Sequence, residues 1–309
     1  MDALIKITEL KKRYGEFTAV DGISFDINRN EVFGLLGPNG AGKTTTISMI
    51  CGLLPTSEGE IHFTNNTGKD KKSMIGYCPQ ENIFYPKLTC LEQLVFIGEM
   101  YGLPSTTVKS RAIELFYLLG LSDKTNVRAS KLSGGMKRRL NICLALVHDP
   151  EILVLDEPEA GLDPQSRVLV RDFIKAFSKQ KTVILTTHNM DEAERLSDRV
   201  AIIDHGKLLL LDTPSNLKRT IGEGDMLELV FECNDENSLK SFSENIKSLS
   251  MSIQVNVNTV FIKHSNIIEH LPKIKNIAER NGLKITEIKL RENSLEDVFI
   301  HLTGRNLRQ

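Results

Sequence analysis

The fold of this chain is decided by the segment Gly37-Pro38-Asn39-Gly40-Ala41-Gly42-Lys43-Thr44. It matches the phosphate-binding pattern G-x-x-x-x-G-K-[ST], and it lies between an apolar run at residues 31–36, which predicts a strand, and a predicted helix. Glycines let several backbone N–H groups converge on one anion, and the helix N-terminus adds a positive dipole end. We expect Lys43 to reach the β- and γ-phosphates of a nucleotide and Thr44 to ligate Mg²⁺, with Thr45 beside them. The alternative is a glycine turn that holds no ligand.

A second chemical signal follows the apolar residues 152–155, which predict a buried strand that ends in Asp156-Glu157. Adjacent acids at the end of a core strand suit a cation or an activated water, although two solvated acids are the alternative. Beside a phosphate loop, Asp156 would hold Mg²⁺ and Glu157 would orient and activate the attacking water. The sequence therefore predicts hydrolysis of a nucleotide.

A third segment, Ser133-Gly134-Gly135, precedes a helix that ends near residue 147. A serine followed by glycines at a helix start can bind an anion through the first N–H groups of the helix. By itself this signal is weak, because Ser-Gly-Gly is also a common N-cap. The basic trio Lys137-Arg138-Arg139 follows, and we interpret it as a solvated helix face.

The chain has 309 residues, enough for about two domains. From residue 140 to 203 helices alternate with buried strands, which predicts a parallel sheet and an α/β domain. Alternating residues at 4–10 and 23–27 predict a small antiparallel sheet, and residues 85–132 predict a helical insertion. These elements form a predicted first domain over residues 1–221.

Residues 222–309 form a predicted second, smaller domain of accessory or regulatory type. Its order of elements, βαββαβ, is that of the ferredoxin-like split motif. The tail restarts a helix at Ser294, and this helix carries an apolar stripe at i, i+3, i+4 and i+7 spacing. The stripe either supports dimerisation or docks the tail on its own domain, and it consists of Leu295, Val298, Phe299 and Leu302.

Composition narrows the classes of partner. The formal net charge of −1 gives no global field for attracting nucleic acid, which is not an expected partner. The 5 cysteines are odd in number and include no CxxC pair, which argues against a disulfide framework and a zinc site. The longest apolar run, residues 142–147, is too short to cross a bilayer, so any membrane span must come from another chain.

Together the motifs resemble the ATPase subunit of an ATP-binding cassette (ABC) transporter, over roughly residues 4 to 220. The resemblance rests on order and spacing of the P-loop, Gln80, Leu132-Ser133-Gly134-Gly135-Met136, Asp156-Glu157, Gly161-Leu162-Asp163 and His188. It implies a P-loop NTPase fold with ATP and Mg²⁺ as cofactors. It also implies a head-to-tail dimer, in which the Ser-Gly-Gly segment of one cassette closes over the ATP of the other.

The same resemblance implies roles for residues that, taken one at a time, would not indicate a function. Tyr14 matches the aromatic residue that stacks on adenine, and Gln80 matches the glutamine that senses Mg²⁺ and the attacking water. Asp163 matches the aspartate that communicates across the dimer, and His188 the histidine that contacts the γ-phosphate. Lys43, Gln80, Glu157 and His188 thus form the expected catalytic set, and Thr44, Gln80 and Asp156 the expected metal set.

The tail at residues 295–305 and the segment 133–139 resemble prokaryotic multidrug and antibiotic-resistance exporters of the ABC-2 type, whose ATPase and permease are separate chains. We therefore expect an ATPase subunit that powers export from the cytoplasmic face of the membrane. One alternative is a non-transport cassette protein, which normally has two cassettes or a long coiled-coil insertion. Another is a nucleotide-dependent switch, which has no need of Glu157. The transported substrate is not readable.

Two departures from the family pattern stand out. Met136 replaces the commonest glutamine, which removes an amide but keeps Ser133 and the backbone N–H groups. Glu159 and Ala160 occupy the loop after Glu157, where an extra acid near the dimer seam could alter closure in either direction. The segment Ile83-Phe84-Tyr85-Pro86 is a candidate permease contact, and the alternative is that it packs the core of the helical insertion.

Overall fold

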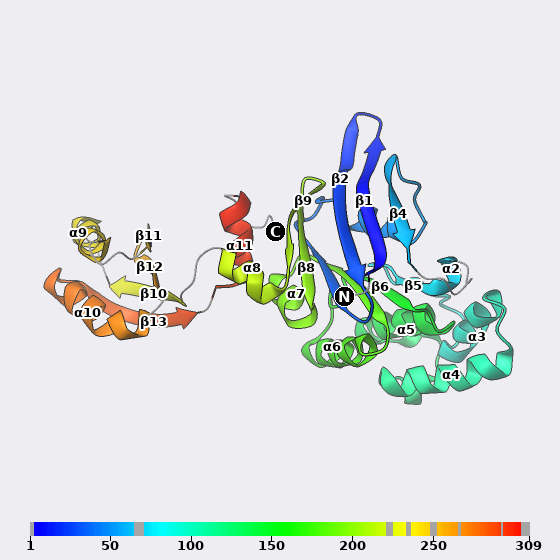
Figure 1. The fold of residues 1–309 in the computed structure, drawn as a ribbon. Helices are drawn as coiled ribbons and strands as arrows, with labels where there is room; N and C mark the ends of the chain where they lie inside the picture. Colours follow the sequence, from blue (N-terminus) through cyan, green and yellow to red (C-terminus); the bar gives the residue numbers. More distant parts are fainter. Residues whose placement is uncertain are drawn as a thin grey trace. The chain divides into compact units, whose positions relative to one another are not determined.

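The computed structural model describes residues 3–64, 71–220, 225–232, 236–247, 252–264, 267–291 and 293–303. The chain forms two compact units that divide between Pro214 and Ser215, and each is described by itself (Figure 1). The predicted domain boundary, between residues 221 and 222, lies outside the described residues.

The first unit is built on a 6-stranded sheet in the order β5-β6-β7-β3-β8-β9, parallel except for the β8–β9 pair. Its strands are β3 (Val32–Leu36), β5 (Ile75–Cys78), β6 (Ile152–Asp156), β7 (Thr182–Thr187), β8 (Arg199–Asp204) and β9 (Lys207–Asp212). Every residue of β3, β6 and β7 is buried, as expected for parallel strands covered on both faces. The predicted parallel α/β core is confirmed.

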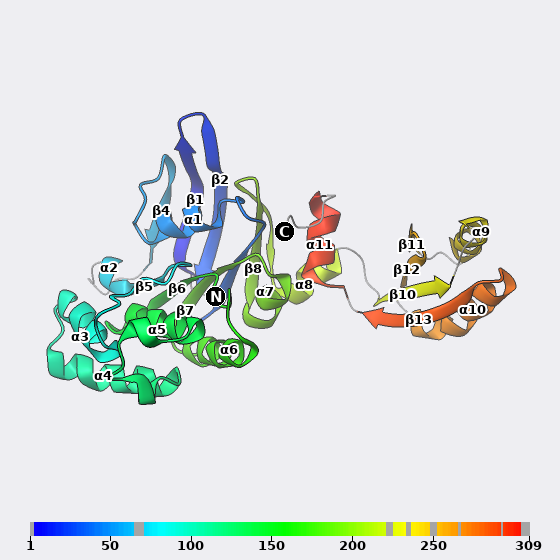
Figure 2. The same ribbon diagram turned by 180° about the vertical axis from the view of Figure 1, so that it is seen from behind.

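The pleat of the strands divides the core of this unit between the two faces of the sheet. Phe33 and Leu35 pack with helix α1 and the antiparallel sheet, whereas Leu153 and Leu155 pack with α5, α6 and the helical insertion. Figure 1, and Figure 2 from behind, show these layers. The helices of the layers are α1 (Lys43–Ile50), α5 (Gly134–Leu146), α6 (Pro164–Ser178) and α7 (Met190–Leu196).

The antiparallel sheet has the strand order β2-β1-β4. Its strands are β1 (Ala3–Tyr14), β2 (Phe17–Asn28) and β4 (Glu58–Phe63). The strands extend well beyond the predicted segments 4–10 and 23–27, because the β1–β2 ladder continues to the pair Tyr14↔Phe17. The turn between the two strands is therefore only Gly15-Glu16, with Gly15 at φ 58°, a left-handed conformation that favours glycine.

The helical insertion contains α3 (Cys90–Met100) and α4 (Ser105–Leu118), with short helices η1 (Ser122–Lys124) and η2 (Ala129–Lys131); α2 (Lys71–Met74) precedes β5. A capping box is present at the start of α3. Thr89 Oγ1 accepts the N–H of Glu92 at 3.2 Å, and Glu92 Oε2 accepts the N–H of Thr89 at 2.7 Å.

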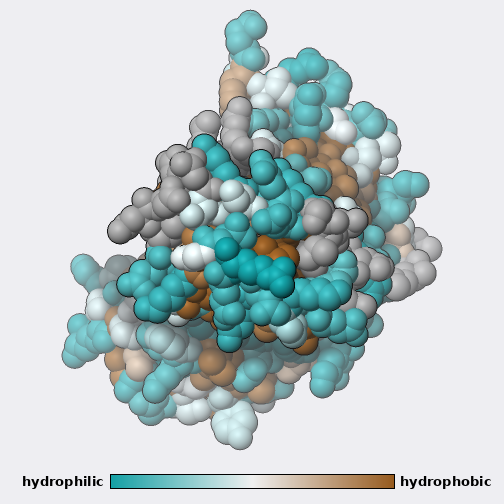
Figure 3. All heavy atoms as spheres, turned by 90° about the vertical axis from the view of Figure 1, so that its left-hand side faces the viewer, coloured by the Kyte–Doolittle hydropathy of each residue, from teal (hydrophilic) through white to brown (hydrophobic). Residues whose placement is uncertain are grey.

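The second unit contains the predicted βαββαβ motif as an antiparallel sheet in the order β11-β12-β10-β13. Alternate residues Leu227, Leu229 and Phe231 of β10 face its core with Phe242 and Ile274. Figure 3 shows the molecule from the left-hand side of Figure 1. On this face hydrophilic residues cover much of the surface, with hydrophobic residues between them. Its elements are β10 (Asp225–Glu232), α9 (Glu236–Lys247), β11 (Ser252–Asn256), β12 (Thr259–His264), α10 (Ile267–Arg280), β13 (Lys284–Arg291) and α11 (Leu295–Thr303), after α8 (Pro214–Thr220).

The C-terminal helix α11 begins where the sequence predicts. Ser294 Oγ accepts the N–H of Asp297 at 3.3 Å, and Asp297 Oδ2 accepts the N–H of Ser294 at 2.9 Å. In the apolar stripe Leu295, Val298 and Phe299 are buried, while Leu302 is 40% exposed. Most of the stripe is therefore buried within the chain, and the two roles expected for it stay predictions.

Candidate functional site

The P-loop between β3 and α1 has glycines where side chains would collide with backbone. A Cβ at Gly37 would lie 2.2 Å from the carbonyl oxygen of Ile203, and one at Gly42 would lie 2.5 Å from that of Ala19. Gly42 also has φ 102°, a left-handed conformation that favours glycine. Because Gly42 is the N-cap of α1, no side chain of the cap residue competes with an anion for the first N–H groups of the helix.

Lys43 follows this loop, with its ammonium turned back into it. The side chain is 7% exposed, and Nζ donates to the carbonyl oxygens of Gly37 at 2.8 Å and Pro38 at 3.1 Å. Burial lowers the pKa of Lys43, and the negative charge of Glu157 opposes this shift. The loop thus carries a desolvated positive charge where the phosphate-binding pattern requires one.

The two acids after β6 are held by the neighbouring strand β7. Thr186 Oγ1 donates to Asp156 Oδ1, and the N–H of Glu157 lies 3.1 Å from the Thr186 carbonyl oxygen and 3.2 Å from Thr186 Oγ1. Asp156 is 2% and Glu157 5% exposed. Glu157 has φ 53°, a conformation that non-glycine residues seldom adopt and that recurs at functional sites.

The Glu157 carboxylate is the meeting point of three loops. Its Oε2 lies 2.8 Å from Nδ1 of His188, which follows β7, and its Oε1 lies 3.9 Å from Nζ of Lys43, which follows β3. Parallel strands place these loops at one edge of the sheet, since β6, β7 and β3 are consecutive in it. A desolvated carboxylate between a lysine and a histidine is suited to accept a proton from water.

The remaining predicted residues lie around this cluster with more solvent contact. Thr44 and Gln80 are exposed, and Thr45 is half-buried. Tyr14 is 48% exposed at the end of the β1–β2 hairpin, with Nζ of Lys12 5.3 Å from its ring centroid. The hairpin reaches the P-loop at Val20, which pairs with Lys12 and would lie 3.4 Å from a Cβ at Gly42.

The Ser-Gly-Gly segment begins α5 as the sequence predicts. Ser133 is the N-cap, and its Oγ accepts the N–H of Met136 at 3.3 Å. Ser133 and Gly134 are exposed, but Gly135 is buried, and a Cβ there would lie 2.7 Å from Ser166 Oγ. Asp163 caps α6, and the N–H and hydroxyl of Ser166 that it accepts lower its pKa.

The interpretation of Lys137-Arg138-Arg139 as a solvated face is wrong. Arg138 is 3% exposed, and Arg139 is half-buried with Nη1 donating to the carbonyl oxygens of Leu119 and Gly120. The physical reason is that α5 runs between other elements and not along the surface, so the carbonyl groups of loops surround its basic side chains. Only the run of positive charge was visible in the sequence.

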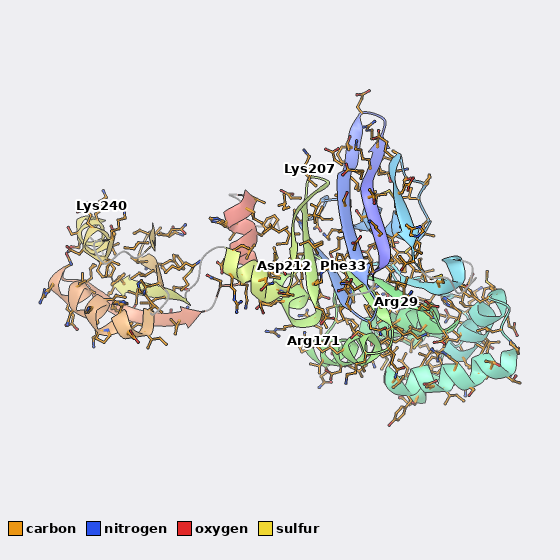
Figure 4. The ribbon with its side chains drawn as sticks, viewed as in Figure 1. Arg29, Phe33, Arg171, Lys207, Asp212 and Lys240 are labelled. Atoms are coloured by element: carbon orange, nitrogen blue, oxygen red, sulfur yellow. The ribbon has the colours of Figure 1, made fainter. Side chains whose placement is uncertain are left out.

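Glu159, the unusual acid after Glu157, is paired inside the chain. Its carboxylate, 8% exposed, accepts from Arg171 Nε at 3.2 Å and from Nη2 at 3.1 Å. Arg171 lies on α6 (Figure 4), and the pairing is bidentate. This pair ties the loop after Glu157 to α6. The sequence separation of residues 159 and 171 does not predict the contact.

Glu192 is a further buried acid that the sequence did not single out. It is 4% exposed, lies in the first turn of α7, and accepts the hydroxyl of Thr187 at 2.5 Å. Burial raises the pKa of Glu192 to about 7, and the charges of Glu159 and Glu157 add to this shift. In the sequence it resembles an ordinary acid at a helix start.

A groove of about 710 Å³ opens beside the Gln80 loop. One wall comes from α3, with Ile97 and Met100, and another from α5, with Asn141 and Leu144. Ile83 lines it and is 66% exposed, whereas Phe84 packs against the core of the helical insertion. The packing alternative for the 83–86 segment therefore holds for Phe84, and a permease contact at Ile83 stays a prediction.

Comparisons with known proteins agree with this geometry. The family described as ABC transporter matches residues 20–160. The chain is 40% identical over 314 residues to the linearmycin resistance ATP-binding protein LnrL of Bacillus subtilis, covering 99% of this chain and 100% of that protein. It is 34% identical over 310 residues to the Nod factor export ATP-binding protein I of Ralstonia nicotianae, covering 99% and 95% respectively.

Solved structures show the same fold for the first unit. An ATP-binding cassette of an ABC transporter in its ADP conformation is 26% identical with a TM-score of 0.62, covering 72% of this chain and 100% of that one. The ATP-binding subunit of another ABC transporter is 27% identical with a TM-score of 0.64, covering 71% and 93%. Within the described ranges, every helix is too short or too polar to serve as a membrane span. The chain belongs to the ABC transporter family, as one of its nucleotide-binding, ATP-binding subunits.

Proposed function

We propose that this chain is a Mg²⁺-dependent ATPase that powers export through a separate membrane permease, from the cytoplasmic face of the membrane. The observation that carries the proposal is the Glu157 carboxylate, which lies 2.8 Å from His188 and 3.9 Å from Lys43 at the edge of the P-loop. The names of the relatives, one for linearmycin resistance and one for Nod factor export, support the export direction.

The residues present suit ATP and Mg²⁺. The P-loop offers backbone N–H groups and a buried ammonium, and glycines at 37 and 42 let the loop pack closely against the backbone of Ile203 and Ala19. Thr44, Asp156 and Gln80 supply the hard oxygen ligands that Mg²⁺ prefers. When bound, Mg²⁺ would neutralise charge on the phosphate oxygens.

Within this proposal each side chain has a distinct task. Lys43 binds phosphate, and Glu157 accepts the proton of the attacking water at Oε1 or Oε2. His188 orients the Glu157 carboxylate from one side. Thr186 fixes Asp156 and the backbone of Glu157, so that both acids keep their positions. Phosphoryl transfer requires mainly such positioning and charge neutralisation.

A head-to-tail dimer is part of the proposal. Ser133 and Gly134 are exposed at the start of α5, and Asp163 is exposed at the start of α6. These residues are therefore accessible to a second cassette, either another copy of this chain or a related subunit, and to the ATP that the second cassette binds. The N–H groups at the start of α5 would complete the phosphate site of the partner.

The permease is proposed to dock in the groove beside Gln80. Ile83 and Met100 line this groove with side chains that are 66% and 70% exposed. Apolar side chains at this exposure suit a protein contact. Because the groove lies beside the Gln80 loop, a movement of the permease could be transmitted through this loop to the site of hydrolysis.

The experiment is phosphate release from MgATP by the purified chain and its Glu157→Gln variant. Glutamine preserves shape but cannot act as a base, so we expect ATP binding to remain and hydrolysis to fall by about 10²-fold or more. A wild-type chain that binds MgATP without Mg²⁺-dependent turnover, or a variant with wild-type turnover, would contradict the proposal.

A further inference from the structure

We propose that Arg138 is a positioning residue that holds the Gln80 loop and the Glu157 loop in one fixed arrangement against α5. This inference rests on the proposed ATPase function. Three of the carbonyl groups to which Arg138 donates, those of Asp156, Glu157 and Pro158, belong to the proposed base and its two neighbours, so its main effect on hydrolysis would pass through Glu157, with the Gln80 loop held alongside.

The hydrogen bonds of the Arg138 guanidinium reach two loops. Nη1 donates to the carbonyl oxygens of Pro79 and Gln80, the latter at 3.2 Å. Nη2 donates to the carbonyl oxygen of Asp156 at 2.5 Å and to that of Glu157 at 3.1 Å. Nε lies 3.4 Å from the carbonyl oxygen of Pro158. One side chain therefore joins the segments that follow the adjacent strands β5 and β6.

The chemistry of arginine explains why this residue type can make the link. The guanidinium is planar, stays charged, and presents its donors in a rigid fork, so that several acceptors can be held at fixed spacing. Arg138 is 3% exposed, and these acceptors are all backbone carbonyl groups. The arrangement of the two loops therefore depends on the guanidinium group of Arg138 and depends little on the side chains of the loop residues.

Glu157 needs such support because its backbone is unusual. At φ 53° the residue is in the left-handed region, which a non-glycine residue keeps only when its surroundings enforce it. Its N–H is held by Thr186, and its carbonyl oxygen accepts from Arg138 Nη2 at 3.1 Å and from the N–H of Ala160 at 3.2 Å. Arg138 is the restraint that ties this backbone to α5, so without it we expect the carboxylate to leave its position between His188 and Lys43.

Arg139 offers a matched control on the same helix. Its Nη1 also donates to backbone carbonyl oxygens, those of Leu119 at 2.8 Å and Gly120 at 3.1 Å, and its Nε lies 3.4 Å from that of Gly135. These acceptors belong to α5 itself and to the two residues that follow α4, not to the Gln80 and Glu157 loops. Loss of Arg139 should affect stability without moving Glu157.

The test compares kcat and KM for MgATP in Arg138→Lys and Arg138→Met with those in Arg139→Lys and Arg139→Met. Each value is normalised to the folded fraction measured by circular dichroism. Misplacement of a reacting group by about 1 Å lowers the rate by about 10²-fold, so we expect kcat to fall by about 10- to 100-fold in both Arg138 variants. KM should change by less than about 3-fold, because the P-loop is untouched. The Arg139 variants should keep kcat within about 3-fold.

A double-mutant cycle with Glu157→Gln separates positioning from a general structural role. If Arg138 acts through Glu157, then Arg138→Lys should lower residual single-turnover hydrolysis by less than about 2-fold in the Glu157→Gln background. An equal loss in both backgrounds would overturn the proposal, as would an unchanged kcat in Arg138→Lys. If Arg138→Met does not fold, Arg138→Lys alone decides. Wild-type turnover in Glu157→Gln alone would instead overturn the proposed function.

Discussion

Nδ1 of His188 lies 2.8 Å from Oε2 of Glu157, which joins the loop after β7 to the acid that follows β6. The Glu157 side chain is 6% exposed and that of His188 52%, so the histidine reaches the buried carboxylate from the solvent side. This pairing places the orientation of the proposed base under the control of a residue that is half exposed to solvent. It leads directly to the first prediction.

Replacing His188 with alanine should lower kcat for ATP hydrolysis by about 10²-fold, because Glu157 loses its orienting partner. ATP binding should stay near wild type, since Lys43 and the P-loop glycines are unchanged. Steady-state hydrolysis and equilibrium nucleotide binding check both expectations. His62→Ala, at an exposed position on β4, is the control and should keep its activity. Full activity in His188→Ala would remove the histidine from the mechanism.

The Glu159–Arg171 pair should stabilise the fold of the loop after Glu157. Arg171→Met leaves a carboxylate that is 8% exposed without its bidentate partner, which should lower the free energy of unfolding by about 2–3 kcal/mol. Glu159→Gln together with Arg171→Met should lose less than the sum of the single changes, with a coupling of about 1–2 kcal/mol. Urea unfolding measures each variant. Additive losses would show that the two side chains do not interact in solution.

Glu192 should make stability depend on pH. The folded-state pKa of about 7 lies above the ordinary value of 4.5, so the folded chain holds this proton more tightly than the unfolded chain. Its contribution is fully present below about pH 4.5 and is lost as the pH rises through about 7, by up to about 1.4 kcal/mol per pH unit. Glu192→Gln lacks this titration.

The free energy of unfolding of Glu192→Gln minus that of the wild type should therefore increase as the pH rises from 5 to 7. Above about pH 7 this difference should become constant. Denaturant titrations at a series of pH values give this difference. Asp191→Asn, at the exposed neighbouring position, is the control and should follow the wild type. A pH-independent difference between Glu192→Gln and the wild type would refute the raised pKa.

Charged residues in the groove beside Gln80 should uncouple the subunit from its permease. Ile83→Glu and Met100→Glu place a carboxylate on side chains that are 66% and 70% exposed, so folding and basal ATPase activity should be kept. Transport and permease-stimulated hydrolysis in reconstituted vesicles should fall by about 10-fold or more, because burying a charge at an interface is costly.

Ile113→Glu on α4 is the matched control for the groove. Ile113 is 62% exposed but is not among the residues that line the groove, so this variant should transport normally. Equal transport by all three variants would place the permease contact elsewhere. Loss of folding in Ile83→Glu would show that the segment packs the helical insertion.

Part of the candidate site could be predicted because its signals are local. Lys43 begins the helix after the short apolar strand β3, and Glu157 directly follows the short apolar strand β6, so each motif is complete within a few residues. The residues that hold the site in place were not predicted. Arg138 seemed one of three surface charges and Glu192 an acid at a helix start, since neither burial nor partner is encoded in the neighbouring residues.

The sequence by itself determined the phosphate loop, the acids after β6, the parallel core and the βαββαβ order, because glycine spacing and hydrophobic periodicity act over one element at a time. Only the tertiary structure decided that Thr186 holds Asp156, that Arg171 holds Glu159, and that Arg138 joins two loops. These contacts connect segments far apart in the chain. Their geometry exists only once the sheet has set β5, β6 and β7 side by side and α5 has packed against them, so that buried donors and acceptors must find one another.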